Sequence, residues 1–201
     1  MNRFKPRIFK YVILIFLISI FIVILNIFVG KNNNFEKGFH SNIEIGGEFE
    51  LTDINKSKFK SSEIKKLKLI YFGYSFCPDV CPIDLMKVTN FFNKNLFLLE
   101  KIKPIFITVD PERDTPENLR DFMDNFGKYI TALTGSKIEI DELLKKYRIY
   151  KKKSGDDENF YTIDHTSLFY LTNVDDIYIT HFSTKAFEEE FFNFLSSNGF
   201  L

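Results

Sequence analysis

The only two cysteines of the chain, Cys77 and Cys81, stand four residues apart between an apolar run and a proline. The run 67–74 has the composition of a strand buried on both faces, and Pro82 suits the first turn of a helix. Thiols at such a junction lie near the free N–H groups of the helix, which stabilise thiolates. The pair therefore indicates either soft-metal binding or cycling between dithiol and disulfide.

A metal held by two thiolates usually needs a third protein ligand, and the chain has three histidines. His40 lies in a polar stretch and His181 ends an expected strand, so both are interpreted as ordinary histidines. His165 precedes an apolar strand, at an edge that could face the cysteine loop. Its position alone leaves the roles of ligand and ordinary residue equally open. Asp79, between the cysteines, and Asp110, after the next strand, are candidates for outer ligands, and Asp110 equally for a capping residue.

Two thiolates and an imidazole form a donor set that suits Cu(I). Zinc is the obvious competitor, but structural zinc sites typically have four protein ligands. The chain has too few cysteines and histidines to supply four without carboxylates. A purely structural disulfide is disfavoured because a bridge across four residues removes little entropy from the unfolded chain.

The N-terminal segment predicts a membrane anchor. Residues 11–29 are uncharged and would form a helix about 28 Å long, close to the bilayer core of about 30 Å. A cleaved signal peptide is the alternative, but its apolar core is usually shorter, and no A-x-A pattern follows here. Basic residues concentrated in 1–10 predict a cytoplasmic N-terminus, a single pass through a bacterial inner membrane and a periplasmic C-terminal domain. Residues 30–44 are interpreted as a polar tether.

Charge argues against one class of function. Residues 1–30 contain four basic residues and no acidic one, which leaves 23 basic against 27 acidic residues in the remainder. Nucleic-acid binding requires a basic surface, so it is not expected here.

Residues 45–201 alternate expected strands with expected helices. The strands are 48–53, 58–60, 67–74, 102–109, 130–134, 166–171 and 177–182. The helices are 86–99, 116–126 with Thr115 as N-cap, 136–148 with a capping box, and 187–195 with Thr184 as N-cap. The charged stretch 151–159 is expected to be a solvated loop. Alternation followed by an antiparallel hairpin predicts a three-layer α/β domain with a mixed sheet.

Four segments together resemble the SCO/SenC family, the membrane-anchored copper proteins that assist cytochrome c oxidase assembly. They are YFGYSFCPDVCP at 71–82, VDPERDTP at 109–116, LTG at 133–135 and IDH at 163–165. The CxxxCP and DPERDTP pair is specific, whereas a lone CxxxC would be weak. The resemblance covers roughly residues 45–195. Glycines frequent in the family are replaced by Asn55-Lys56-Ser57 and Lys65-Lys66, which leaves local turn geometry open.

The resemblance implies a thioredoxin-like domain over 45–201 behind a single anchor at 11–29. It implies one copper site with ligands Cys77, Cys81 and His165, for Cu(I) and also Cu(II). The implied role is a metallochaperone, not an enzyme, that delivers copper to the CuA centre of oxidase subunit II. The alternative is a thiol–disulfide oxidoreductase that reduces the cysteines of that subunit or of another exported partner.

Overall fold

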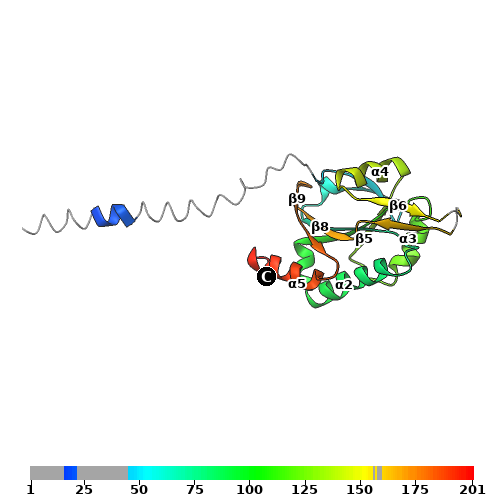
Figure 1. Ribbon diagram of the computed structural model, residues 1–201. Helices are drawn as coiled ribbons and strands as arrows, with labels where there is room; N and C mark the ends of the chain where they lie inside the picture. The colour runs from blue at the N-terminus through cyan, green and yellow to red at the C-terminus, as the bar shows by residue number, and fades with distance from the viewer. Residues whose placement is uncertain (1–15, 22–44, 156, 158–159) are drawn as a thin grey trace, which may run out of the picture. The chain divides into compact units, whose positions relative to one another are not determined.

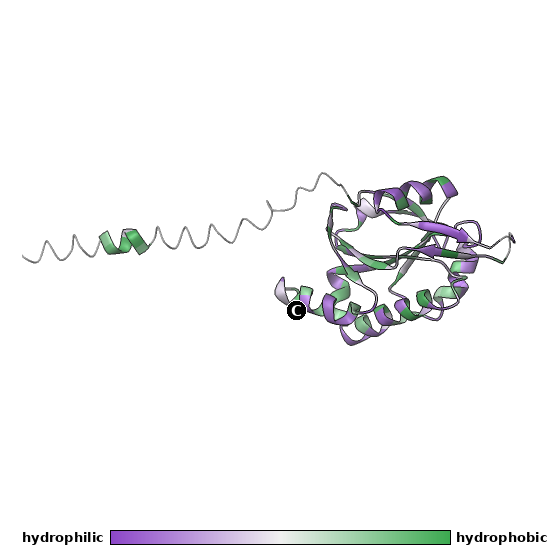
Figure 2. Cartoon of the chain, in the orientation of Figure 1, coloured by the Kyte–Doolittle hydropathy of each residue, from purple (hydrophilic) through white to green (hydrophobic). Residues whose placement is uncertain are grey.

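The computed structural model describes residues 16–21, 45–155, 157 and 160–201. The chain divides into two compact units, Met1–Ile43 and Glu44–Leu201. In the first unit, residues 16–21 are helical and strongly hydrophobic (Figure 2). Among the described residues, no helix is long and apolar enough to span a bilayer. The anchor predicted at 11–29 lies outside the described residues apart from this short piece.

A seven-stranded mixed sheet forms the centre of the second unit (Figure 1). The strand order is β2-β1-β5-β4-β3-β8-β9. The bounds are β1 (Glu50–Asp53), β2 (Lys58–Lys60), β3 (Leu67–Gly73), β4 (Ile102–Thr108), β5 (Thr131–Thr134), β8 (Leu168–Thr172) and β9 (Tyr178–Ser183). Strands β3, β4 and β5 are parallel, while β1 and β8 run antiparallel to their neighbours. The predicted mixed sheet is therefore confirmed.

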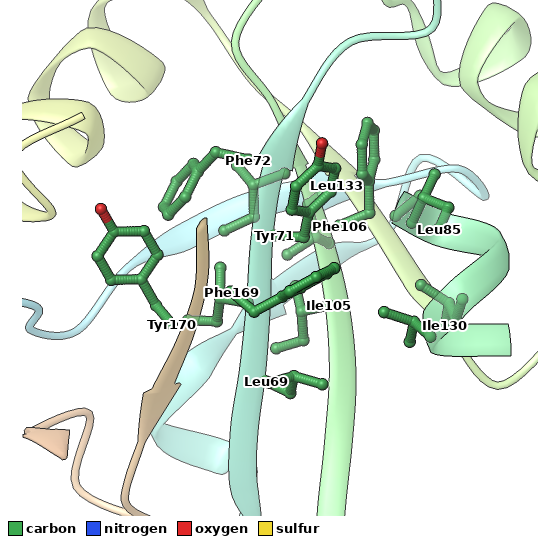
Figure 3. Close-up of a cluster of buried hydrophobic side chains, with 14 of the residues drawn as sticks. Leu69, Tyr71, Phe72, Leu85, Ile105, Phe106, Ile130, Leu133, Phe169 and Tyr170 are labelled. Carbon is green, nitrogen blue, oxygen red and sulfur yellow. The ribbon is translucent and has the colours of Figure 1, made fainter. Parts of the chain in front are cut away.

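Helices cover both faces of this sheet, because successive side chains of a buried strand point to opposite sides. The helices are α2 (Val80–Lys94), α3 (Pro116–Met123), α4 (Lys137–Lys146) and α5 (Phe187–Ser197). Tyr71 and Phe72 leave β3 on opposite sides (Figure 3). Tyr71 packs on Phe169, while Phe72 packs on Tyr147 beside α4. Figure 1 shows α4 on one side of the sheet and α2 with α5 on the other.

Two helices differ from the prediction, α2 in where it ends and α5 in its N-cap. Helix α2 begins at Val80 with Pro82 in its first turn, as predicted, because a proline there removes only an N–H that has no helical partner. It ends at Lys94, and a separate 3-10 turn, η3 (Leu96–Glu100), occupies the rest of the predicted helix. Helix α5 begins after Ala186 without a side-chain cap, so the prediction of Thr184 as N-cap is wrong. The caps predicted for α3 and α4 are confirmed.

The stretch 151–159, predicted as a loop, contains a strand. Strand β6 (Lys151–Ser154) pairs with β7 (Thr162–His165) in a two-stranded antiparallel sheet. Lysine-rich β6 has poor intrinsic strand propensity, but backbone pairing with β7 outweighs that preference. Figure 2 shows β6 in the purple of hydrophilic residues. The pairing places Lys151 opposite His165 in the register, so β6 is the strand that holds this predicted ligand in place.

The β1–β2 turn tolerates the missing glycine. Lys56 adopts a left-handed backbone with φ 64°. The Asp53 carboxylate accepts bonds from the backbone N–H groups of Asn55, at 2.8 Å, and Ser57, at 2.9 Å. These bonds offset part of the cost of about 1–2 kcal/mol that a residue with a Cβ has in this conformation.

Candidate metal and thiol site

The cysteine loop joins the end of β3 to the start of α2, at the carboxyl edge of the parallel strands. Both thiols are free. Cys77 is 8% exposed and Cys81, in the first turn of α2, is 0% exposed. The backbone N–H of Cys77 donates to the carbonyl of Tyr74 at 3.3 Å, which closes a turn between strand and helix. Cys77 therefore lies at the rim of the site and Cys81 at its base.

The two thiols have opposite acidities. A hydrogen bond from the Cys81 thiol lowers the pKa of Cys77 to about 5, with the N–H groups of Asp79, Cys81 and Val80 adding to the effect against burial. The same bond, together with burial, raises the pKa of Cys81 well above its ordinary value. Cys77 is therefore a thiolate at neutral pH, while Cys81 keeps its proton.

Alkylation of the reduced, metal-free chain by iodoacetamide is expected to follow the titration of Cys77. Because only the thiolate reacts, the rate should fall as pH drops through about 5 and level off above it. One adduct, at Cys77, is expected by mass spectrometry. The urea-denatured chain is the control, with a midpoint near pH 8.5. A folded-state rate still rising between pH 8 and 9 would contradict the assignment.

His165 ends β7 and faces the base of the cysteine loop. Its Nε2 lies 3.6 Å from the Cys81 sulfur, although 84 residues separate them in the chain. Its Nδ1 lies 3.0 Å from the carbonyl oxygen of Thr166. Since a carbonyl only accepts, Nδ1 carries the proton of the neutral ring, and the lone pair of Nε2 is directed at Cys81.

This separation fits two ligands of one metal ion. A sulfur at about 2.3 Å and a nitrogen at about 2.0 Å from an ion lie about 3.5 Å apart at a tetrahedral angle. The observed Cys81–His165 distance of 3.6 Å agrees with that value. In the part of the chain that the structure describes, no three His, Cys, Asp or Glu side chains are grouped closely enough to hold a metal. The structure thus brings Cys81 and His165 together at a distance that would fit two ligands of one ion, and their role as metal ligands stays a prediction.

The β6–β7 hairpin is bonded to both neighbouring loops, which fixes the place of His165. The Tyr74 hydroxyl accepts from the N–H of Ile163 at 3.1 Å. The Tyr161 hydroxyl donates to Asp110 at 2.7 Å, and Arg113 Nη1 donates to the Tyr161 carbonyl at 3.0 Å. The Arg113 guanidinium also lies 3.5 Å from the centre of the Tyr161 ring, a cation–π distance.

The comparisons with known proteins point to one family. The model of the SCO1/SenC family matches residues 38–197. The chain belongs to the SCO1/SenC family. It is 39% identical over 166 residues to an SCO2-like protein of Rickettsia felis, with 80% of each chain covered.

Two copper-bound structures resemble this SCO1/SenC chain. ScoI of Bradyrhizobium japonicum with copper bound is 38% identical, with a TM-score of 0.69 over 76% of this chain and 98% of that one. Yeast Sco1 with copper bound is 30% identical, with a TM-score of 0.66 over 77% of this chain and 90% of that one. The thioredoxin-like α/β fold implied by the resemblance is confirmed.

The two aspartates predicted as outer ligands have different surroundings in this SCO1/SenC chain. Asp110 is buried, and its carboxylate accepts from Tyr161 and, at 2.5 Å, from Arg113 Nε. Asp79 is exposed at the start of α2 and makes no capping bond with its side chain. Asp110 therefore supports the hairpin of His165, and an outer-ligand role for either residue stays a prediction.

The DPERDTP motif also supports the cysteine loop, a role that sequence reasoning missed. Asp114 accepts from the N–H of Ser75, two residues before Cys77, and from the Ser75 hydroxyl. It also accepts from Thr108 at 2.5 Å, and burial raises the pKa of this carboxyl. The sequence signal that could have revealed this role is the DPERDTP motif itself, which is specific. The remaining histidine of the described domain, His181, instead hydrogen-bonds to Tyr178.

Gly73 is a second residue that sequence reasoning missed, and its replacement by alanine should destabilise the site. A Cβ there would lie 3.0 Å from the Cys81 sulfur, 2.9 Å from Phe106 and 3.1 Å from Tyr71. Overpacking of this kind costs about 1–3 kcal/mol. Urea unfolding followed by circular dichroism measures the loss. Unchanged stability would mean that the cysteine loop shifts to accommodate the added methyl group without cost, and it would contradict the prediction.

Proposed function

We propose that this chain binds copper through Cys77, Cys81 and His165 and delivers it to the CuA centre of cytochrome c oxidase subunit II. The observation that carries the proposal is the 3.6 Å approach of the His165 Nε2 lone pair to the Cys81 sulfur. Two similar structures, ScoI of Bradyrhizobium japonicum and yeast Sco1, have copper bound. Assistance in oxidase assembly is the role of the SCO/SenC family.

Each of the three proposed ligands has a different role in binding a copper ion. Cys77 offers a thiolate at neutral pH from the rim of the site, where the ion arrives. Cys81 must lose its proton when it binds, so copper affinity should fall at low pH. His165, whose Nδ1 donates to the Thr166 carbonyl, offers Nε2 as the third ligand. Release to a partner follows by ligand exchange at the rim, with Cys77 the first ligand to be replaced.

Attachment to a membrane would bring the site near its target. Residues 11–29 have the length and composition of a transmembrane helix, and residues 1–10 have the basic charge of a cytoplasmic flank. In this proposal the chain crosses the bacterial inner membrane once, with residues 45–201 in the periplasm. Copper delivery to a membrane-bound oxidase would then need no diffusing carrier.

Copper titration of matched histidine variants tests the proposal. The full chain, purified in detergent, should bind one Cu(I) in competition with a Cu(I) chelator. His165→Ala should weaken this binding, whereas His181→Ala, which changes an exposed histidine of the same domain, should not. The loaded chain should then transfer copper to a soluble subunit II fragment. Equal affinities in the two variants would overturn the ligand set.

A thiol–disulfide reductase is the second candidate, favoured by the bonded thiol pair. The Cys77 thiolate would attack a partner disulfide, and the Cys81 thiolate, after losing its proton, would then release the partner as a dithiol. Two electrons pass to the partner, and a Cys77–Cys81 disulfide remains. Single-turnover reduction of an oxidised subunit II fragment should survive His165→Ala and be lost in Cys77→Ala. Loss in both variants would exclude this function.

A further inference from the structure

A buried carboxylate lies close to the cysteine pair in α2, and it is not one of the predicted metal ligands. Asp84, in the second turn of α2, is 3% exposed. Three donors converge on it, namely the Tyr71 hydroxyl at 3.1 Å, the Ser167 hydroxyl at 3.1 Å and Lys87 Nζ at 2.8 Å. Lys87 also donates to the carbonyl of Thr184 at 2.8 Å.

The donors come from the elements that carry the site. Tyr71 belongs to β3, which leads into the cysteine loop, and its hydroxyl also hydrogen-bonds to Cys81. Asp84 follows Cys81 by three residues on the same helix. Ser167 follows His165 by two residues in the β7–β8 connection. Hydrogen bonds thus run from Cys81 through Tyr71 and Asp84 to Ser167, and the chain from Ser167 back to His165 closes the ring at the Cys81–His165 contact.

Packing alone does not account for a carboxylate at this position. Its neighbours on the buried face of α2, Leu85 and Val88, are apolar. Burying a charge has a large desolvation cost, and apolar replacement of a buried ion pair is often neutral or stabilising. An apolar residue, however, could not accept the hydroxyl bonds of Tyr71 and Ser167. What Asp84 provides is a fixed link between the helix of Cys81 and the segment of His165.

We propose that Asp84 is a positioning residue of the copper site, which through Ser167 keeps His165 Nε2 directed at the Cys81 sulfur. This inference rests on the proposed function, since it requires His165 to be a copper ligand. Asp84 itself makes no contact with the ion. Its loss leaves all three ligands in the chain and alters only how they are held.

Two variants separate positioning from folding. Ser167→Ala removes the link to the histidine segment at a half-buried position and leaves the carboxylate in place. Asp84→Asn removes the charge and one acceptor at the centre of the ring. Ser57→Ala, an exposed serine in the β1–β2 turn, is the matched control. Circular dichroism of the full chain in detergent checks each fold. If Asp84→Asn does not fold, Ser167→Ala decides the question.

The readouts are Cu(I) dissociation constants and the spectrum of the Cu(II) form. Loss of an outer-shell partner typically weakens metal binding 10- to 100-fold, so Ser167→Ala should raise the dissociation constant about tenfold. The nitrogen superhyperfine splitting from His165 in the Cu(II) resonance spectrum should weaken as well. Within His165→Ala, adding Ser167→Ala should change the affinity less than about twofold, because coupled residues do not add.

The outcomes distinguish this inference from the proposed function. If His165→Ala weakens copper binding but Ser167→Ala behaves like Ser57→Ala, the positioning role is overturned and the copper site stands. An equal effect of Ser167→Ala with and without His165 also overturns it, since the serine would then act by another route. If His165→Ala binds copper like the wild type, both the ligand set and the positioning role are overturned.

Discussion

Replacing Cys81 by serine is expected to weaken Cu(I) binding by the full chain at least about 100-fold. Outer-shell partners alone are worth 10- to 100-fold, and this change removes an inner ligand. A serine hydroxyl does not ionise near neutral pH and is a hard donor, whereas Cu(I) prefers thiolate sulfur. Cys81 is 0% exposed, so water has no ready access to replace the lost ligand.

The variant is well suited to a clean measurement. Serine nearly matches cysteine in size, so the close contacts of Cys81 with Gly73 should persist. The chain then contains a single thiol, Cys77, whose titre by a colorimetric reagent reports the concentration of intact protein. Cys77→Ser is the companion variant and should lose a comparable amount of affinity. One-to-one Cu(I) binding within tenfold of the wild type in Cys81→Ser would contradict the prediction.

Breaking the buried ion pair between Lys68 and Asp176 is expected to cost about 3–5 kcal/mol of unfolding free energy. Both side chains are 0% exposed, and Lys68 Nζ lies 2.9 Å from Asp176 Oδ1. The contact is a charge pair without hydrogen-bond alignment, because Oδ1 has no hydrogen-bond partner. Lys68 instead donates to the carbonyls of Asn173 and Val174, at 3.2 and 3.1 Å.

The neutral variant Asp176→Asn isolates the loss of charge. Asp176 has φ 61°, a left-handed conformation that asparagine tolerates, so backbone strain does not change. Asparagine also keeps an acceptor for the Ser61 hydroxyl, which donates to Asp176 Oδ2 at 2.8 Å. What remains is a buried ammonium without its counterion. Urea unfolding followed by circular dichroism measures the cost.

Two further variants test whether the loss of stability comes from leaving a buried charge without its partner. Adding Lys68→Met to Asp176→Asn should restore part of the stability, because the uncompensated charge is then removed as well. Asp124→Asn is the matched control, since its pair with Lys128, at 2.5 Å, has side chains 64% and 72% exposed. An exposed pair is worth at most about 1 kcal/mol. Equal losses in Asp124→Asn and Asp176→Asn would refute the role of burial.

Local signals in the sequence predicted the elements whose causes are themselves local. The run 67–74 predicted β3, which spans Leu67–Gly73. Thr115 with Pro116 predicted the start of α3, and Ser136 with Glu139 predicted the capping box of α4. Caps and proline act within one helical turn, so a short stretch of sequence contains all the residues involved.

The elements that the sequence misassigned depend on distant partners. Residues 151–154 look like a solvated loop because nothing nearby indicates that β7 will pair with them. Lys68 stands in an otherwise apolar strand, and its burial requires Asp176, which is 108 residues away in the chain. Propensity and periodicity describe neighbours in sequence and therefore cannot anticipate such pairs.

The candidate site, too, was predicted only in part from the sequence. The sequence by itself determined that two thiols stand at a strand-to-helix junction, and its motifs pointed to the family. From position alone, His165 was as consistent with an ordinary histidine as with a ligand. Only the tertiary structure decided that its Nε2 lies 3.6 Å from Cys81, and that Asp84 and Ser167 link the two segments. The reason is physical, since a contact between residues 84 positions apart is set by the packing of a hairpin against a helix.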